Sequence, residues 1–284
     1  MRDYLDYVNA LTAAMREAAS VSAPQPSQAA GAAAPDAPVA LILSPHPDDE
    51  MIVGALPLRL LREAGMRVVN LAVTLGSNRA RRPGRLAELR NACAHAGFAL
   101  EIVGREGLDG VLPELALDPD ALAAAAKPVA DMLRQLRPAA VFLPHALDAN
   151  RTHKGVHLVG TEAMKLARIT CDVFETEFWA PMAHPNLVVE SSEEDVAMLV
   201  SALALHTGED SRNPYHLRLP AWMIDNVRRG AELVGTQGGA APDFTFATLY
   251  RHFRMTDGRP NEEAVDSQFL SRQGSSSALL IKNG

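Results

Sequence analysis

The stretch Pro45–Glu50, with the sequence Pro-His-Pro-Asp-Asp-Glu, gathers the residue types best able to do chemistry. Imidazole and carboxylate groups are ligands that divalent metals take from proteins. His46, Asp48 and Asp49 lie at most three positions apart, so they fit one loop or one first helical turn. Adjacent aspartates do not easily point the same way. One carboxylate can therefore bind a metal while its neighbour acts as general base toward a metal-activated water.

Two ligands are too few for a zinc site, so a third must come from elsewhere in the chain. The candidates are His145, His153 and His157, which follow a later apolar run. His153 and His157 are four positions apart and would share one face of a helix. Surface histidines often fall at that spacing by chance, so the residue pattern leaves the third ligand open.

The elements that must position these residues alternate between strand and helix. The apolar runs predict strands at Val39–Leu43, Arg67–Val73, Phe98–Val103, Ala139–Leu143 and Asp172–Trp179. The segments between them predict helices at Met51–Ala64, Pro83–Ala96, Asp118–Leu136, where Asp118 caps the helix, and His153–Ala167. This alternation predicts a parallel sheet with helices on both faces, whose ligands lie beyond the strand C-termini. The loops after the first, second and fourth strands should therefore converge on one site.

We therefore predict an α/β protein with a Rossmann-like, mostly parallel sheet, a single main domain and an N-terminal helical arm. Residues 1–38 are assigned to that arm: an amphipathic helix over residues 1–20, then a linker rich in Ala, Pro, Ser and Gly. Residues 39–284 form the main domain. Beyond Pro181 the pattern is less regular. It predicts a helix at Ser191–Leu205, a short strand pair within Phe244–Phe253, and a tail of uncertain order from Ser271.

Composition excludes some classes of function. The net charge of −7 argues against a nucleic-acid surface, and no apolar run approaches the roughly 20 residues that a membrane helix needs. The charged N-terminus lacks the apolar core of a secretory signal, so a cytoplasmic, bacterial-type enzyme is expected. Cys93 and Cys171 lie in apolar segments and are expected to be buried free thiols.

A resemblance to a known family enters at the two motifs. Pro45–Glu50 resembles the (A/P)HPDDE motif of the PIG-L/LmbE-like zinc-dependent de-N-acetylases, which include GlcNAc-phosphatidylinositol deacetylase and the mycothiol and bacillithiol deacetylases. The segment 150–157 resembles that family's HPDH-x-x-V motif, with His153 at the closing histidine. The order and the separation of the two motifs agree as well. The resemblance covers roughly Pro38 to Lys165 and is loose beyond Pro181.

The resemblance implies a role for each matching residue. His46, Asp49 and His153 would bind Zn²⁺, and Asp48 would take a proton from the attacking water and return it to the leaving amine. The reaction would remove an N-acetyl or other N-acyl group from a glucosamine-type small molecule and release acetate and a free amine. The resemblance also keeps a homo-oligomer open, with residues 1–20 as an assembly arm.

The second motif departs from the family at two positions. Asn150 stands where relatives often have a histidine thought to stabilise the oxyanion, and Thr152 stands where they often have an aspartate. Asn150 can donate a neutral hydrogen bond, so it is assigned a catalytic role, but it cannot be a cationic acid. His145 and His157 are the alternatives for that role, although His157 is expected to be structural.

The same residues also have purely structural interpretations. A proline-fixed turn that caps a helix would use His46, Asp48 and Asp49 in the same places, because aspartate at a helix N-terminus is stabilising. The second motif weighs against that interpretation. Glu50 is expected in a first helical turn or beside the ligands, and His206 as a packed histidine at a helix end.

Substrate contacts are predicted from the loop after the second strand. Arginines there are more often a solvated face than a site; they are Arg79, Arg81, Arg82, Arg85 and Arg90. Similar family members place an arginine at the position of Arg85, so Arg85 is assigned to the substrate site, with Asn78 as a weaker candidate. Tyr215 and Trp222 are expected to be packing residues, with an aromatic sugar platform as the alternative.

Two other functions compete with the deacetylase. The first is a zinc amidase of the same site type that acts on a non-sugar conjugate. The second is a Rossmann-like protein that binds a metal or a nucleotide sugar and has little hydrolytic activity, including a glycosyltransferase whose Asp48-Asp49 pair holds the metal. No G-x-G-x-x-G follows the first strand, which disfavours the second alternative.

Overall fold

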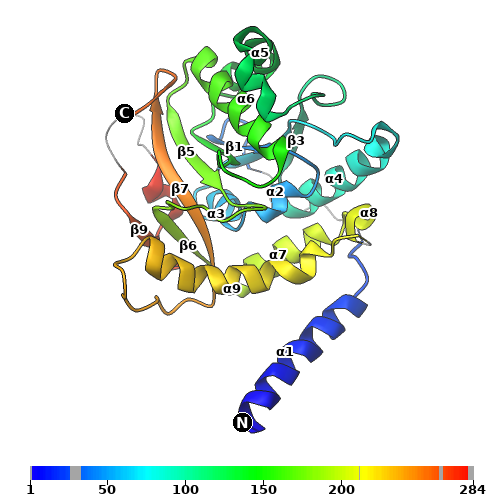
Figure 1. Cartoon of the computed structure of the whole chain (residues 1–284), viewed down its shortest axis with the longest axis vertical. Coiled ribbons are helices and arrows are strands. Elements are labelled where there is room, and N and C mark those ends of the chain that lie inside the picture. Colours follow the sequence, from blue (N-terminus) through cyan, green and yellow to red (C-terminus); the bar gives the residue numbers. More distant parts are fainter. Residues whose placement is uncertain (1, 26–32, 211, 262–264, 281–284) are drawn as a thin grey trace.

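The computed structural model describes residues 2–25, 33–210, 212–261 and 265–280, and these form a sheet flanked by helices (Figure 1). The strand order is β3-β2-β1-β4-β5-β7-β6-β9, and β8 pairs with β7. The strands are β1 Val39–Ser44, β2 Arg67–Ala72, β3 Ala99–Ile102, β4 Ala140–Pro144, β5 Cys171–Thr176, β6 Leu187–Ser191, β7 Phe246–Thr256, β8 Arg259–Pro260 and β9 Gln268–Leu270. The five strands from β3 to β5 pair in parallel, which confirms the predicted fold class.

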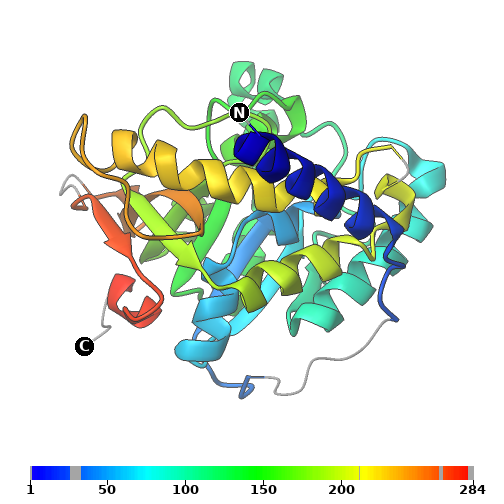
Figure 2. The same cartoon turned by 90° about the horizontal axis from the view of Figure 1, so that it is seen from below.

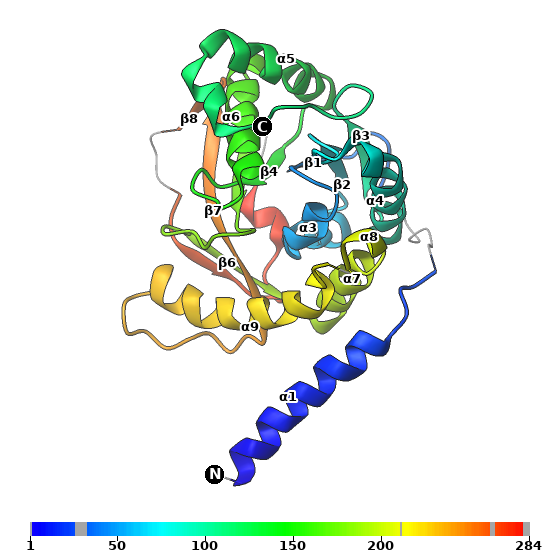
Figure 3. The same cartoon turned by 45° about the vertical axis from the view of Figure 1, so that its right-hand side comes forward.

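Helices cover both faces of the sheet (Figure 3). The α-helices are α1 Arg2–Ser20, α2 Asp49–Ile52, α3 Leu56–Glu63, α4 Arg82–Ala96, α5 Pro119–Leu136, α6 Arg151–Ala167, α7 Glu193–Leu203, α8 Thr207–Asp210 and α9 Tyr215–Leu233, and the 3₁₀ turns are η1 Arg79–Arg81, η2 Pro113–Leu117 and η3 Ser276–Leu279. Helices α7 and α9 pack against each other (Figure 2). The predicted cap of α5 is confirmed, because the Asp118 side chain accepts hydrogen bonds from the backbone N–H groups of Asp120 and Ala121.

The apolar side chains of β1 explain why helices cover both faces of the sheet. Successive β1 side chains alternate: Ala40 and Ile42 join the core beneath α2, α3, α4, α7 and α9, while Leu41 and Leu43 join the core beneath α5 and α6. A strand that is apolar at every position must be buried on both faces. Cys93 and Cys171 are buried free thiols, as predicted.

The predicted helix Met51–Ala64 was wrong, because two helices, α2 and α3, occupy that segment. Gly54 lies between them with a φ of +89°, a conformation that glycine adopts at little cost. A Cβ atom at Gly54 would lie 2.3 Å from the Thr248 hydroxyl of β7. The break therefore lets the chain turn closely against a strand about two hundred residues further along.

The C-terminal half also differs from prediction. The predicted strand pair within Phe244–Phe253 was wrong: the segment belongs to one long strand, β7, which pairs antiparallel with both β5 and β6. The short strands β6, β8 and β9 were missed, because runs of two to five residues carry too little periodicity. The helix predicted at Ser191–Leu205 is confirmed as α7, whose cap is Ser192.

Helix α1 extends away from the rest of the molecule and has no buried residue (Figure 1). The predicted linker lies partly outside the described residues, at 26–32, as does the end of the predicted tail, at 281–284. Within the described part of the chain, no helix combines the length and apolarity that crossing a bilayer requires.

Candidate metal centre and active site

The candidate site lies where the strand order reverses. From β1 the chain proceeds through β2 and β3 to one side of the sheet, and through β4 and β5 to the other. Crevices at such reversal points, beyond the C-terminal ends of the strands, are where open α/β sheets bind ligands. His46 and Asp49 follow β1, and His153 lies in the first turn of α6, which follows β4. The fold thus brings together two segments separated by more than one hundred residues.

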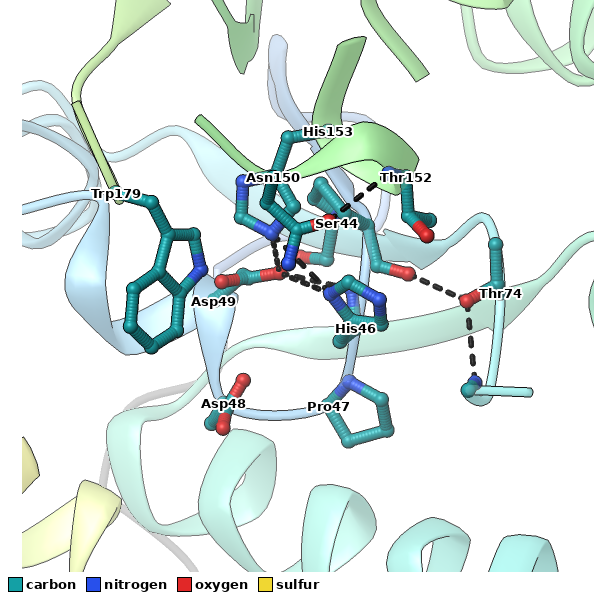
Figure 4. A network of polar contacts seen from close by, with 12 residues as sticks. Ser44, His46, Pro47, Asp48, Asp49, Thr74, Asn150, Thr152, His153 and Trp179 are labelled. Carbon is teal, nitrogen blue, oxygen red and sulfur yellow. Dashed lines mark hydrogen bonds and ion pairs between the residues drawn. The ribbon is translucent and has the colours of Figure 1, made fainter. Parts of the chain in front are cut away.

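His46, Asp49 and His153 point toward one another (Figure 4). The Nδ1 of His46 and the Nε2 of His153 are 3.2 Å apart, and they lie 3.3 and 3.2 Å from the Oδ2 of Asp49. Ligands held at about 2.0–2.1 Å by a tetrahedral zinc ion are about 3.3 Å apart. The spacing and the donor types therefore fit a metal ion with three protein ligands.

The charges at this centre favour a cation. Burial would raise the pKa of the Asp49 carboxyl, but His153 and His46 lower it well below its ordinary value, so Asp49 is ionised. Burial would lower the pKa of His153, but Asp49 and Asp148 together raise it to about 9. In the metal-free protein this imidazole carries a proton that a bound metal would replace.

A second carboxylate orients His153. The Oδ2 of Asp148, which is fully buried, lies 3.6 Å from the Nδ1 of His153, on the side of the ring away from Asp49. Asp148 is held by the backbone N–H groups of Asn150, at 2.7 Å, and Trp179, at 3.1 Å. A carboxylate behind a ligating histidine sets the ring's tautomer and direction. No motif in the sequence predicts this role for Asp148.

Asp48 is held in a strained conformation beside the ligands. Its φ is 112°, which is rare for a residue with a side chain and costs roughly 1–3 kcal/mol. Its backbone N–H donates to Oε2 of the buried Glu50, and Oε1 of Glu50 accepts from Nε2 of His206 at 2.8 Å. Burial and the charge of Asp49 raise the pKa of Asp48 well above its ordinary value. His206 does lie at a helix end, but it also supports the carboxylate that holds Asp48.

A cavity of about 580 Å³ opens over these residues. It is lined by His46, Asp48, Asp49, Gly76, Ser77, Asn78, Arg81, Arg85, Ala149, Asn150, Trp179, Glu209, Arg212, Asn213 and Tyr215. The predicted substrate residues Arg85 and Asn78 both reach it, and Arg85 also donates to the backbone carbonyl of Pro47. Asn150 caps α6 through its Oδ1, which accepts from the Thr152 N–H, and this leaves the Nδ2 donor of Asn150 for the cavity.

Other predicted candidates lie elsewhere. Among the described residues, neither His145 nor His157 lines this cavity. His145 bonds the Ala180 carbonyl oxygen and His157 bonds the Pro144 carbonyl oxygen, so each ring is held by backbone outside the cavity. Of the arginines, Arg79 and Arg82 pair with Asp109, and Arg90 does not line the cavity, whereas Arg81 does line it and pairs with Glu209.

The C-terminal segments contribute lining residues that sequence reasoning missed. Glu209 of α8 lies 2.8 Å from Arg81 and 3.7 Å from Arg85, so it anchors α8 over the arginine loop. Tyr215, expected to be a packing residue with a sugar platform as the alternative, lines the cavity, and its buried hydroxyl has no hydrogen-bond partner among the described residues. Its ring lies 5.0 Å from that of Trp179. No local pattern around these residues signals a site.

The fold and the three-ligand cluster define a Rossmann-like α/β protein with a candidate metal centre at the sheet's reversal point. Residues 41–164 match the family model described as PIG-L, GlcNAc-PI de-N-acetylase. These residues contain both motifs and all three candidate ligands, so the predicted resemblance to the PIG-L family is confirmed over this part of the chain. No curated protein matches the chain.

Solved structures show the same fold at low identity. The conserved protein TT1542 from Thermus thermophilus is 18% identical with a TM-score of 0.57, and the alignment covers 76% of this chain and 94% of that protein. GalB, the 4-carboxy-2-hydroxymuconate hydratase of Pseudomonas putida KT2440, is 16% identical with a TM-score of 0.56, and the alignment covers 76% of this chain and 95% of GalB. N,N'-diacetylchitobiose deacetylase from Pyrococcus horikoshii is 14% identical with a TM-score of 0.56, and the alignment covers 78% of this chain and 85% of the deacetylase. At these identities the likeness concerns the fold alone.

Proposed function

We propose that the protein is a zinc-dependent hydrolase that removes an N-acyl group from a glucosamine-type amide and releases a carboxylate and a free amine. The observation that carries the proposal is the cluster of His46, Asp49 and the buried His153, which adjoins a cavity lined by His46, Asp49 and the buried Asp48. The PIG-L family match and the fold shared with a chitobiose deacetylase support the choice of amide hydrolysis. Because a hydratase shares that fold too, the site and not the fold must decide.

The chain's own residues divide the work. His46, Asp49 and His153 would hold zinc, which when bound lowers the pKa of a water molecule and polarises a carbonyl group. Asp48, whose pKa is raised by burial and by the charge of Asp49, takes the proton of the attacking water and returns it to the leaving amine. Asn150 offers its amide donor to the carbonyl oxygen as negative charge develops there. Arg85 and Asn78 bind the polar part of the substrate.

The test separates metal binding from chemistry. Zinc per chain is measured alongside amine release from N-acetylglucosamine derivatives, for wild type, Asp48→Asn and His153→Ala. Asparagine tolerates positive φ better than most residues, so Asp48→Asn keeps the turn. We expect zinc near one per chain in wild type and Asp48→Asn with activity in wild type alone, and loss of zinc in His153→Ala. Full activity in Asp48→Asn, or zinc retained in His153→Ala, would overturn the assignment.

Asn150→His tests the departure from the family. If a histidine at this position stabilises the oxyanion better than the neutral amide does, the rate of amine release should rise. An unchanged or lower rate would show that Asn150 suits this cavity as it stands. Hydration of an unsaturated acid by the zinc-loaded protein, without amine release from any amide, would refute the hydrolase in favour of hydratase chemistry.

A further inference from the structure

A second, apolar cavity adjoins the candidate active site. It has a volume of about 140 Å³ and is lined by Ile52, Phe178, Trp179, Tyr215, Arg218, Leu219 and Trp222. Apart from Arg218, these side chains are aliphatic or aromatic. Trp179 and Tyr215 line both cavities, so this aromatic pair borders the two spaces.

The apolar cavity lies close to the reacting centre. The ring of Phe178 lies 5.0 Å from that of His153, edge to face. Ile52 is in the same short helix as Asp49. The backbone N–H of Trp179 donates to Asp148, the carboxylate behind His153, and Figure 4 shows the Trp179 ring beside the ligand cluster. A group bound in the apolar cavity would therefore lie next to the side chains that surround the candidate metal ligands.

The main cavity has a wall of the opposite character. Charged and amide side chains from the arginine loop and from the segment after α7 form that wall; they are Asn78, Arg81, Arg85, Glu209, Arg212 and Asn213. A polar amine half, such as a sugar with several hydroxyl groups, suits this wall. An amide whose nitrogen faces the polar wall directs its acyl carbon toward the apolar side.

We propose that the apolar cavity binds the acyl group of the substrate and selects chains longer than acetyl. This inference rests on the proposed hydrolase function and names its substrate class: N-acyl amides with a medium-length aliphatic or aromatic acyl group. An apolar protein cavity of about 150 Å³ holds a molecule the size of benzene, so this one accommodates about six carbon atoms. Each methylene buried there should favour binding by about fourfold.

Intrinsic fluorescence reports directly on this cavity, because the chain has two tryptophans and both, Trp179 and Trp222, line it. Titration with hexanoate should change the emission at concentrations where acetate does not. N-acetyl-, N-butanoyl- and N-hexanoylglucosamine should show kcat/KM rising by about 15-fold for each added pair of methylenes. Leu219→Phe, which fills the cavity, and Trp222→Ala, which opens it, should both lower the ratio of hexanoyl to acetyl kcat/KM. Ile224→Ala, on an exposed part of the same helix, is the matched control and should leave the ratio unchanged.

The outcomes separate this inference from the proposed function. Amine release from N-acetylglucosamine without preference for longer acyl chains, together with no response to hexanoate, would overturn the acyl pocket and leave the hydrolase intact. A response to hexyl N-acetylglucosaminide but not to acyl length would assign the cavity to the amine half of the substrate and also refute the inference. Absence of amine release from every amide, with hexanoate still changing the emission, would refute the hydrolase instead.

Discussion

Replacing His206 by alanine tests whether a buried ion pair outside the ligand set controls catalysis. The side chains of His206 and Glu50 are 2% and 0% exposed and bond at 2.8 Å, and the other oxygen of Glu50 holds the strained backbone of Asp48. Removing one partner of a buried pair leaves an unpaired buried charge, which destabilises by roughly 3–5 kcal/mol. At about 2–4 °C per kcal/mol for a domain of this size class, the melting temperature should fall by roughly 6–20 °C.

The chain contains a matched control for this change. Asp172 and His252 form a second buried pair with the same 2.8 Å distance, between β5 and β7. His252→Ala should also lower stability, though less, because Arg254 stays 3.5 Å from Asp172. At a temperature where both variants are folded, His206→Ala should lower kcat by about 10- to 100-fold, the scale of a small misplacement of a reacting group. His252→Ala should leave kcat unchanged. Equal kcat in both variants would refute the positioning role.

The pH dependence of stability follows from the same pair. Burial would lower the pKa of His206, but the charge and hydrogen bond of Glu50 raise it above the ordinary value of about 6.5. A histidine with a raised folded-state pKa contributes stability that is complete below about pH 6.5 and is lost as the pH rises through the folded value. The difference in unfolding free energy between wild type and His206→Ala should therefore shrink with rising pH, which denaturant melts measure. A difference that grows with pH would contradict this interpretation of the pair.

Three further outcomes are expected. Gly155→Ala should lower the melting temperature and the metal content, because the added Cβ would lie 2.4 Å from the Val111 carbonyl oxygen. In the control Gly84→Ala the added Cβ meets no described atom within 4 Å, so thermal melts should show a neutral or stabilising effect. Zinc affinity, measured against a chelator, should rise by about tenfold per pH unit up to the His153 pKa of about 9, because zinc displaces the proton on His153. A zinc affinity that does not change with pH would contradict the assignment of His153 as a ligand. Tyr215→Phe removes a buried hydroxyl that has no partner among the described residues, so thermal melts should show unchanged stability. A lower kcat would show that the hydroxyl contacts the substrate, and an unchanged kcat would show that it does not.

The sequence alone predicted the parallel half of the sheet, because those strands are long apolar runs separated by capped helices. The topological rule also predicted that the loops after β1 and β4 converge at one edge, whereas the set His46, Asp49 and His153 was predicted from the resemblance of two local motifs to a known family. These features depend on short-range pattern and on one topological rule. The strands β6, β8 and β9 are short and lie at or near the sheet edge, so their pairing depends on distant partners that no local pattern shows.

Only the tertiary structure decided what surrounds the metal ligands. The support of Glu50 by His206 joins residues 156 positions apart, and the break at Gly54 depends on Thr248. Tyr215 and Trp222 look like ordinary packing residues in the sequence, since an aromatic side chain carries no mark of which space it lines. Burial, strain at Asp48 and the apolar cavity beside the polar one arise from packing between distant segments, and no local motif carries a sign of them.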